Sequence, residues 1–182
     1  FQEYGINPIV VTLDVSNSPG AFHNAGLDND LLEEIPEGTE VVRIPCDDAD
    51  KYYSSKLRTF VTRYFSIKDN IAKRWKRNLF ENIGSVIETH QPKVIITTLP
   101  PFSAGLLAVQ ISKKYDLPLV VDMRDGWAKW CMSPYGSWIH YYLTYLEEKK
   151  IFKQAQAVTT VTAQLADIFR NTHTELDPHK FH

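Results

Sequence analysis

Residues 94–127 constrain the fold of this chain more than any other stretch. Apolar, β-branched residues from Val94 to Thr98 predict a strand, and a second apolar run from Leu119 to Asp122 predicts another. Between them, apolar residues recur at helical spacing from Ala104 to Tyr115, directly after Ser103, a residue type that often caps a helix N-terminus. Strand, helix and strand in this order form a βαβ unit, whose crossover makes the two strands parallel.

The loops at the carboxyl ends of these two strands form the predicted site. In open parallel sheets, ligands bind in the crevice beyond those ends. The helix N-terminus offers free backbone N–H groups and a partial positive charge, which suit a phosphate or an anionic transition state. Arg124 offers a bidentate fork for phosphate or carboxylate, and Asp125 offers a general base for a sugar hydroxyl or a group that orients it. The alternative is that Asp122, Arg124 and Asp125 pair with one another and cap the following loop.

The remaining apolar runs continue the alternation of strands and helices. Further strands are predicted at 9–13, 40–44 and 157–161, and further helices at 30–35, 79–90, 137–154 and 163–170, the last with Thr162 as its N-cap. This alternation favours an α/β fold, an open three-layer αβα sandwich with a mainly parallel sheet of at least five strands. Residues 171–182 are polar and predict a linker or tail.

Composition narrows the class of protein. With 43% hydrophobic and 23% charged residues in 182, the chain has the composition of a soluble globular domain, and no apolar run approaches the length of a membrane span. A net charge of −2 argues against a general nucleic-acid binder. Cys46 and Cys131 fit neither a metal motif nor a disulfide framework, so they predict reduced thiols in a cytoplasmic protein.

Two groups of polar residues are expected to be solvated. Glu147 and Glu148 lie beside Lys149 and Lys150 in the predicted helix at 137–154, which suggests a solvent-facing position for both carboxylates. Five of the six histidines, His173 among them, fall in predicted loops or the tail, where a solvated imidazole is the default.

The charges are distributed unevenly along the chain. Nine acidic residues and one base lie in 28–50, whereas nine basic residues and one acid lie in 51–77, interleaved with aromatic residues. Residues 63–75 predict a basic amphipathic helix. It either packs its aromatic residues on the sheet or lies on an anionic membrane surface. The residues predicted to face that membrane are Lys73, Arg74, Trp75, Lys76 and Arg77.

Most common cofactor and nucleophile motifs are absent from the sequence. There is no GxGxxG, GxxxxGK[ST] or GxSxG motif. Asp48-Ala49-Asp50 matches the DxD pattern by which many sugar-transfer enzymes hold a divalent metal, but such short matches are common in acidic loops. We therefore expect a solvated loop there, with no metal and no cofactor.

Together, these segments resemble the N-terminal domain of family 4 glycosyltransferases of the GT-B fold. The family's TxPP-S loop, helix and D-RD-W loop are similar, in order and spacing, to ITTLPPFSAGLLAVQISKKYDLPLVVDMRDGW. Its next landmark, a strand followed by a helix, resembles AQAVTTVTAQLADIF, and the end of its first helix with its second strand resembles QEYGINPIVVTLD. An insertion common in the bacterial branch that acts on cell-envelope polysaccharides resembles LLEEIPEGTEVVRIP.

The resemblance implies two Rossmann-like domains that face each other across a cleft, with residues 1–170 forming the N-terminal one. The C-terminal domain binds a nucleotide-sugar donor, and the N-terminal domain mainly binds a glycan or lipid-linked acceptor. The sugar is transferred with retention of configuration and without a bound metal. Many members lie on the inner face of the membrane through basic, aromatic helices. Carried onto this chain, the resemblance implies a catalytic Asp125 and substrate-binding Pro101, Phe102, Ser103, Arg124, Trp127 and Thr162.

Two family features are not found in the sequence. The first strand with its Gly-rich loop is expected before Phe1, and the donor domain is expected after His182, so residues 1–182 alone are expected to lack transferase activity. Two alternatives remain open. One is a nucleotide-sugar 2-epimerase of the same fold, although the acidic and histidine residues expected at its strand ends are sparse here. The other is a non-catalytic domain that binds a sugar or a lipid.

Overall fold

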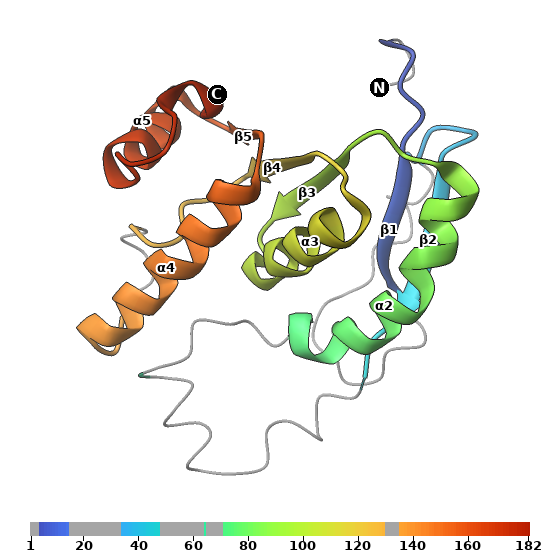
Figure 1. Ribbon diagram of the computed structural model, residues 1–182, viewed down its shortest axis with the longest axis horizontal. Coiled ribbons are helices and arrows are strands. Elements are labelled where there is room, and N and C mark those ends of the chain that lie inside the picture. The colour runs from blue at the N-terminus through green and yellow to red at the C-terminus, as the bar shows by residue number, and fades with distance from the viewer. Residues whose placement is uncertain (1–3, 15–33, 48–63, 65–70, 130–134) are drawn as a thin grey trace. The chain divides into compact units, whose positions relative to one another are not determined.

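A computed structural model describes residues 4–14, 34–47, 64, 71–129 and 135–182 (Figure 1). The chain folds as two compact units, residues 1–54 with 73–84 and residues 55–72 with 85–182. Helix α2 (Ile71–His90) contributes to both units. No helix in the described ranges is long and apolar enough to cross a membrane.

The first unit contains a two-stranded parallel sheet of β1 (Ile9–Asp14) and β2 (Glu40–Pro45). Trp75, Leu79 and Ile83 recur at a spacing of four residues in α2, so they share one buried face of the helix. The indole Nε1 of Trp75 donates to the backbone oxygen of Ile44 at 3.0 Å. This bond satisfies the polar atom of a buried aromatic ring.

Two of the residues predicted to face a membrane are buried instead. Arg74 is 5% exposed and Trp75 is 8% exposed, so the prediction is wrong for both. The cause is a pair of backbone acceptors at and beyond the end of β2, because the Nε of Arg74 donates to the oxygen of Asp47 at 2.7 Å and Trp75 donates to Ile44. Lys73, Lys76 and Arg77 are exposed, and Arg77 pairs with Asp47 at 3.0 Å. Residue 63 and residues 65–70 of the predicted helix lie outside the described residues.

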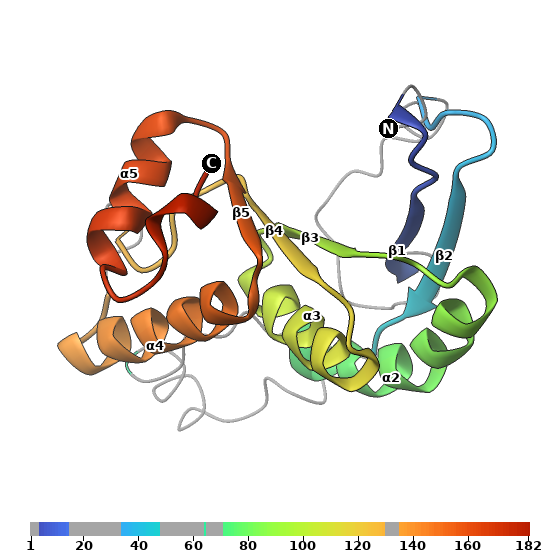
Figure 2. The ribbon, with the colours of Figure 1, turned by 45° about the horizontal axis from the view of Figure 1, so that its top comes forward.

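The second unit contains a three-stranded parallel sheet in the order β3-β4-β5. Its strands are β3 (Ile95–Leu99), β4 (Leu119–Met123) and β5 (Ala157–Thr160), and its helices include α3 (Phe102–Tyr115), α4 (Trp138–Gln154) and α5 (Ala163–Thr172). Helices α3 and α4 lie on one side of this sheet and α5 lies on the other (Figure 2). Alternate residues of β4, namely Leu119, Val121 and Met123, are fully buried in the core.

The predicted α/β fold is confirmed, since parallel sheets are flanked by helices and each predicted strand is found within one residue at either end. The sheet itself differs from the prediction. Within the described ranges the strands form one sheet of two and one of three, whereas the sequence predicts a single sheet of at least five. Apolar periodicity identifies strands but not their partners. Most of the predicted helix at 30–35 lies outside the described residues.

Residues 171–182 fold onto the second unit, so the predicted linker or tail is wrong. His173 and Phe181 are 0% and 1% exposed, and residues 178–180 form a short 3-10 helix. Phe181 forms a parallel β-bridge with Val158, and the backbone N–H of His182 donates to the backbone oxygen of Val158 at 2.8 Å. The Nζ of Lys180 donates to the last carbonyls of α4, at Phe152 and Ala155. These few long-range contacts could not be predicted from the polar composition of the segment.

Replacing Phe181 by alanine tests this segment. Its ring packs against Phe152 and Phe169, with centroids 5.5 and 6.3 Å away. Phe181→Ala is expected to lower the free energy of unfolding by about 3–5 kcal/mol, as for other buried phenylalanines, in urea denaturation. The control is His179→Ala at an exposed position, with an expected change within about 0.5 kcal/mol. Equal midpoints for the two variants would mean that the segment is not part of the fold.

Candidate functional site

The carboxyl ends of β3, β4 and β5 lie at one edge of the second unit's sheet. Leu99 is the register partner of Met123, and Met123 is the partner of Thr160, so the three following loops begin level with one another. The backbone N–H of Arg124 donates to the oxygen of Leu99 at 2.9 Å. This edge is where open parallel sheets bind ligands. The expected proximity of the loops after β3 and β4 is therefore found.

An aromatic stack joins these two loops. The rings of Phe102 and Trp127 lie 4.8 Å apart and are parallel within 2°. Such a pair contributes roughly 0.5–1.5 kcal/mol beyond its buried area. Trp127 is buried and Phe102 is half-buried, so these two predicted substrate-binding rings pack against each other. Their stack forms a fixed apolar support at the sheet edge.

The prediction that Ser103 is the N-cap of helix α3 is wrong. Helix α3 begins at Phe102 with Pro101 as its N-cap, and the Pro101 side chain makes no capping hydrogen bond. Pro101 suits this position because its backbone is extended, with φ −73° and ψ 131°, so helical geometry starts before the serine is reached. The side chain of Ser103 is buried, and its Oγ accepts from the backbone N–H of Ala72 at 3.1 Å. Ser103 thus supports the start of α2 and does not face solvent.

Arg124 and Asp125 follow β4 at this edge. Arg124 is exposed and Asp125 is half-buried. No hydrogen bond or ion pair to either side chain is found within the part of the chain that the structure describes. The alternative in which they pair with Asp122 is not observed, because Oδ1 of Asp122 instead accepts from Oγ1 of Thr159 at 2.8 Å. The exposed Arg124 side chain and the partly exposed Asp125 side chain are accessible to a ligand.

Thr162 is the N-cap of α5, as predicted. Its backbone is extended, and its Oγ1 accepts from the backbone N–H of Leu165 at 3.2 Å. The residue is exposed just beyond β5, two residues after the register partner of Met123. It therefore lies at the same sheet edge as Arg124, and the helix that it caps directs its N-terminus there.

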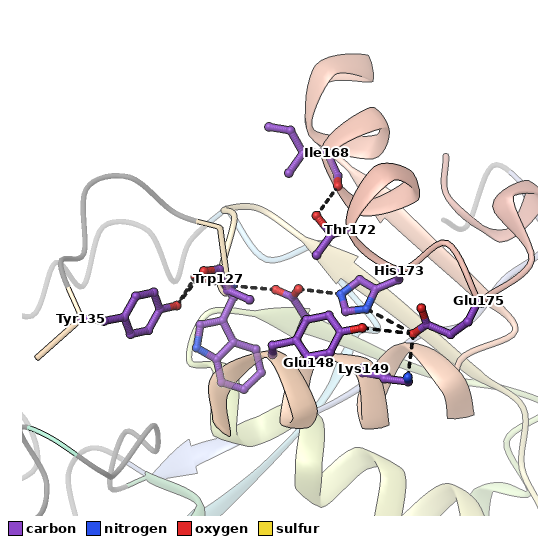
Figure 3. A network of polar contacts seen from close by, with 10 residues as sticks. Trp127, Tyr135, Glu148, Lys149, Ile168, Thr172, His173 and Glu175 are labelled. Atoms are coloured by element: carbon purple, nitrogen blue, oxygen red, sulfur yellow. Dashed lines mark hydrogen bonds and ion pairs between the residues drawn. The ribbon is translucent and has the colours of Figure 1, made fainter. Parts of the chain in front are cut away.

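The backbone just after Trp127 is held from two sides (Figure 3). The Tyr135 hydroxyl lies 2.9 Å from the carbonyl oxygens of Trp127 and Ala128. On the other side, the backbone N–H of Ala128 donates to Oε2 of Glu148 at 2.9 Å. Burial, reinforced by the nearby Glu148 carboxylate, raises the pKa of Tyr135 to about 12. Tyr135 therefore remains a hydrogen-bond donor at neutral pH.

Sequence reasoning missed Glu148 and His173. Both were expected to be solvated, yet Glu148 is 1% exposed and His173 is 0% exposed, with Oε1 and Nε2 2.7 Å apart. A signal was present in the helical spacing. The buried residues of α4 are Thr144, Glu148, Ile151 and Phe152, which share one face of the helix, so Glu148 lies in register with the apolar core.

The described residues contain no group of three or more His, Cys, Asp and Glu side chains able to hold a metal ion. Asp48 and Asp50 of the DxD match lie outside the described residues. The groups that the structure does bring to the sheet edge are an arginine, an aspartate, an aromatic stack and two helix N-termini. These groups suit the binding of anionic and hydroxyl-bearing ligands.

Comparison with known proteins agrees with this arrangement. The family model for the glycosyl transferase 4-like domain matches residues 8–182, which is nearly the whole chain and includes the segment from His173 to His182. A search of curated proteins gave no match. Parallel sheets flanked by helices are the fold expected for this family. The chain therefore belongs to the glycosyltransferase family 4-like domains and is the N-terminal domain type of the GT-B enzymes.

Proposed function

We propose that this domain forms the acceptor side of a glycosyltransferase. The enzyme transfers a sugar from a nucleotide-sugar donor to a glycan or lipid-linked acceptor, with retention of configuration and without a metal. The observation that carries this proposal is the Arg124–Asp125 pair, open to ligand at the carboxyl edge of β4 in a chain of this family. The resemblance assigns the donor to a second domain, which is the proposed partner of this one.

The chemistry of the edge fits a sugar acceptor. A carboxylate such as Asp125 accepts a hydrogen bond from a sugar hydroxyl, and it orients that hydroxyl or takes its proton during transfer. Arg124 offers two parallel donors to a phosphate or carboxylate. The beginning of α3 at Phe102 adds the partial positive charge of a helix N-terminus at the same edge.

A non-catalytic sugar- or lipid-binding domain and a 2-epimerase are the competing functions. An epimerase interconverts its nucleotide-sugar without an acceptor, whereas a transferase releases the nucleotide only as the acceptor is glycosylated. A non-catalytic domain does neither. Product analysis with and without an acceptor therefore separates the three functions.

Replacing Asp125 by asparagine in the full-length protein tests the catalytic assignment. Asp125→Asn is expected to lower kcat for sugar transfer by about 10²–10⁴-fold, the usual range for a general acid or base. The control is Asp116→Asn, the same chemical change at the C-terminus of α3, which is expected to leave kcat unchanged. Unchanged transfer by folded Asp125→Asn protein, with circular dichroism as the check of folding, would remove Asp125 from the mechanism.

We also propose a peripheral position on an anionic, cytoplasmic membrane surface, as in the bacterial enzymes of cell-envelope polysaccharide synthesis. The resemblance motivates this proposal, and the exposed bases Lys73, Lys76 and Arg77 of α2 support it. Lysine and arginine near such a surface each contribute about 1 kcal/mol, and salt weakens the attraction.

Vesicle co-sedimentation tests the membrane proposal. Reversing Lys73 and Lys76 to glutamate leaves the Arg77–Asp47 pair intact. It is expected to weaken binding to vesicles rich in phosphatidylserine by about 10-fold or more. The control reverses Lys113 and Lys150, which are exposed lysines of the second unit, and is expected to bind as the wild type does. Vesicle binding that changes neither with salt concentration nor with the charge reversal at Lys73 and Lys76 would contradict the proposal.

A further inference from the structure

The most unusual buried feature of the second unit is an acid paired with an imidazole. The carboxylate of Glu148 uses one oxygen for His173, at 2.7 Å, and the other for the backbone N–H of Ala128, at 2.9 Å. Burying such a group is costly, and apolar residues of similar size often give equal or greater stability. A contribution to fold stability is therefore a weak explanation for the pair.

His173 is held so that Nε2 points at Glu148 (Figure 3). Its ring stacks on Tyr145 at 5.0 Å and meets the ring edge of Phe152 at 5.3 Å. Its buried Nδ1 has no hydrogen-bond partner among the residues that the structure describes, and Oε1 of Glu175 lies 3.8 Å away. Since the Glu148 carboxylate accepts, we assign the shared proton to Nε2.

Glu175 is itself fixed outside this pair. Its Oε1 accepts from Nζ of Lys149 at 2.9 Å, and the hydroxyl of Tyr145 lies 3.4 Å away. The Lys149 hydrogen bond lowers the pKa of Glu175. The Glu175 carboxylate therefore stays charged beside the ring of His173, and α4 and the end of α5 are tied together around the imidazole.

The Glu148–His173 pair is connected to the candidate site by one hydrogen bond, from the backbone N–H of Ala128 to Glu148. Ala128 directly follows Trp127, whose ring stacks on Phe102. At the other end of the loop, the N–H of Arg124 donates to Leu99 of β3. Asp125 thus lies on a short span of backbone between two fixed amides.

We propose that Glu148 and His173 form a positioning pair that fixes the Asp125–Trp127 loop for sugar transfer, although neither residue touches the substrate. The inference rests on the proposed function, because it assumes that Asp125 acts on the acceptor. Its physical basis is that a shift of about 1 Å in a reacting group costs on the order of 100-fold in rate. A carboxylate suits this role because it accepts from a peptide N–H and an imidazole at once.

Two substitutions at Glu148 in the full-length protein test the pair. Glu148→Leu removes the acceptor of the Ala128 N–H and is expected to lower kcat by about 100-fold with little change in KM. Glu148→Gln keeps an oxygen for that N–H, and its amide can donate to Nε2 of the other imidazole tautomer, so kcat is expected to stay near the wild-type value. A purely structural role predicts instead that both variants lose activity in proportion to the folded fraction, which would overturn the proposal.

A double-mutant cycle with Asp125→Asn separates positioning from a general weakening of the enzyme. If Glu148 acts through Asp125, adding Glu148→Leu to Asp125→Asn lowers kcat no further. Multiplied losses would contradict the proposal. If Asp125→Asn alone keeps full activity, the catalytic assignment of Asp125, on which this proposal rests, fails. If Asp125→Asn is inactive while folded Glu148→Leu keeps full kcat, only the positioning pair fails.

Tyr135→Phe keeps the proposal testable if Glu148→Leu does not fold. It removes one hydroxyl that holds the carbonyls of Trp127 and Ala128 and leaves Glu148 in place. Loss of that hydrogen bond is expected to lower kcat by up to about tenfold without a matching rise in KM. An unchanged kcat in folded Tyr135→Phe protein would show that this peptide does not set the geometry of the site.

Discussion

Parallel pairing of β3, β4 and β5 is the constraint on which the candidate site depends. It brings the ends of three strands to one edge, so that groups distant in sequence, such as Phe102, Arg124 and Thr162, emerge at the same level. Each loop then begins from a fixed strand. The N-termini of α3 and α5 add their partial positive charge at this edge. In this glycosyltransferase family 4-like domain, the position of the candidate site is thus set by the register of the sheet.

The loop after β4 receives further support from polar groups beneath it. A carboxylate on α4 and a phenol beyond the loop both bond to the peptide groups at Trp127 and Ala128, and an imidazole at the end of α5 bonds to that carboxylate. The C-terminal segment keeps this assembly in place, because Lys180 donates to the end of α4 and Phe181 packs on Phe152. Residues that touch no ligand can therefore matter for the proposed reaction as much as Arg124 and Asp125.

The elements of this fold could be predicted from the sequence because they depend on local patterns. Runs of apolar residues gave each strand, and Thr162 marked the start of α5. The failures involve long-range contacts. Ser103 bonds to Ala72, Trp75 bonds to Ile44, and His173 reaches Glu148, none of which composition or periodicity reveals. The contact of Phe181 with Val158 was missed for the same reason, because the segment around it is polar. Glu148 is the exception, since its helical spacing from Thr144 and Ile151 indicated burial that its charge argued against.

At the candidate site, sequence placed Arg124 and Asp125 correctly at a strand end but did not show what holds them. Their loop is fixed at both ends, by Leu99 at Arg124 and by Glu148 at Ala128. Amide hydrogen exchange measured by NMR on the wild-type protein tests this directly. The N–H groups of Arg124 and Ala128 are expected to exchange as slowly as those of β4. Exchange of the Ala128 N–H at the rate of an exposed loop would contradict the fixation of the loop at that end.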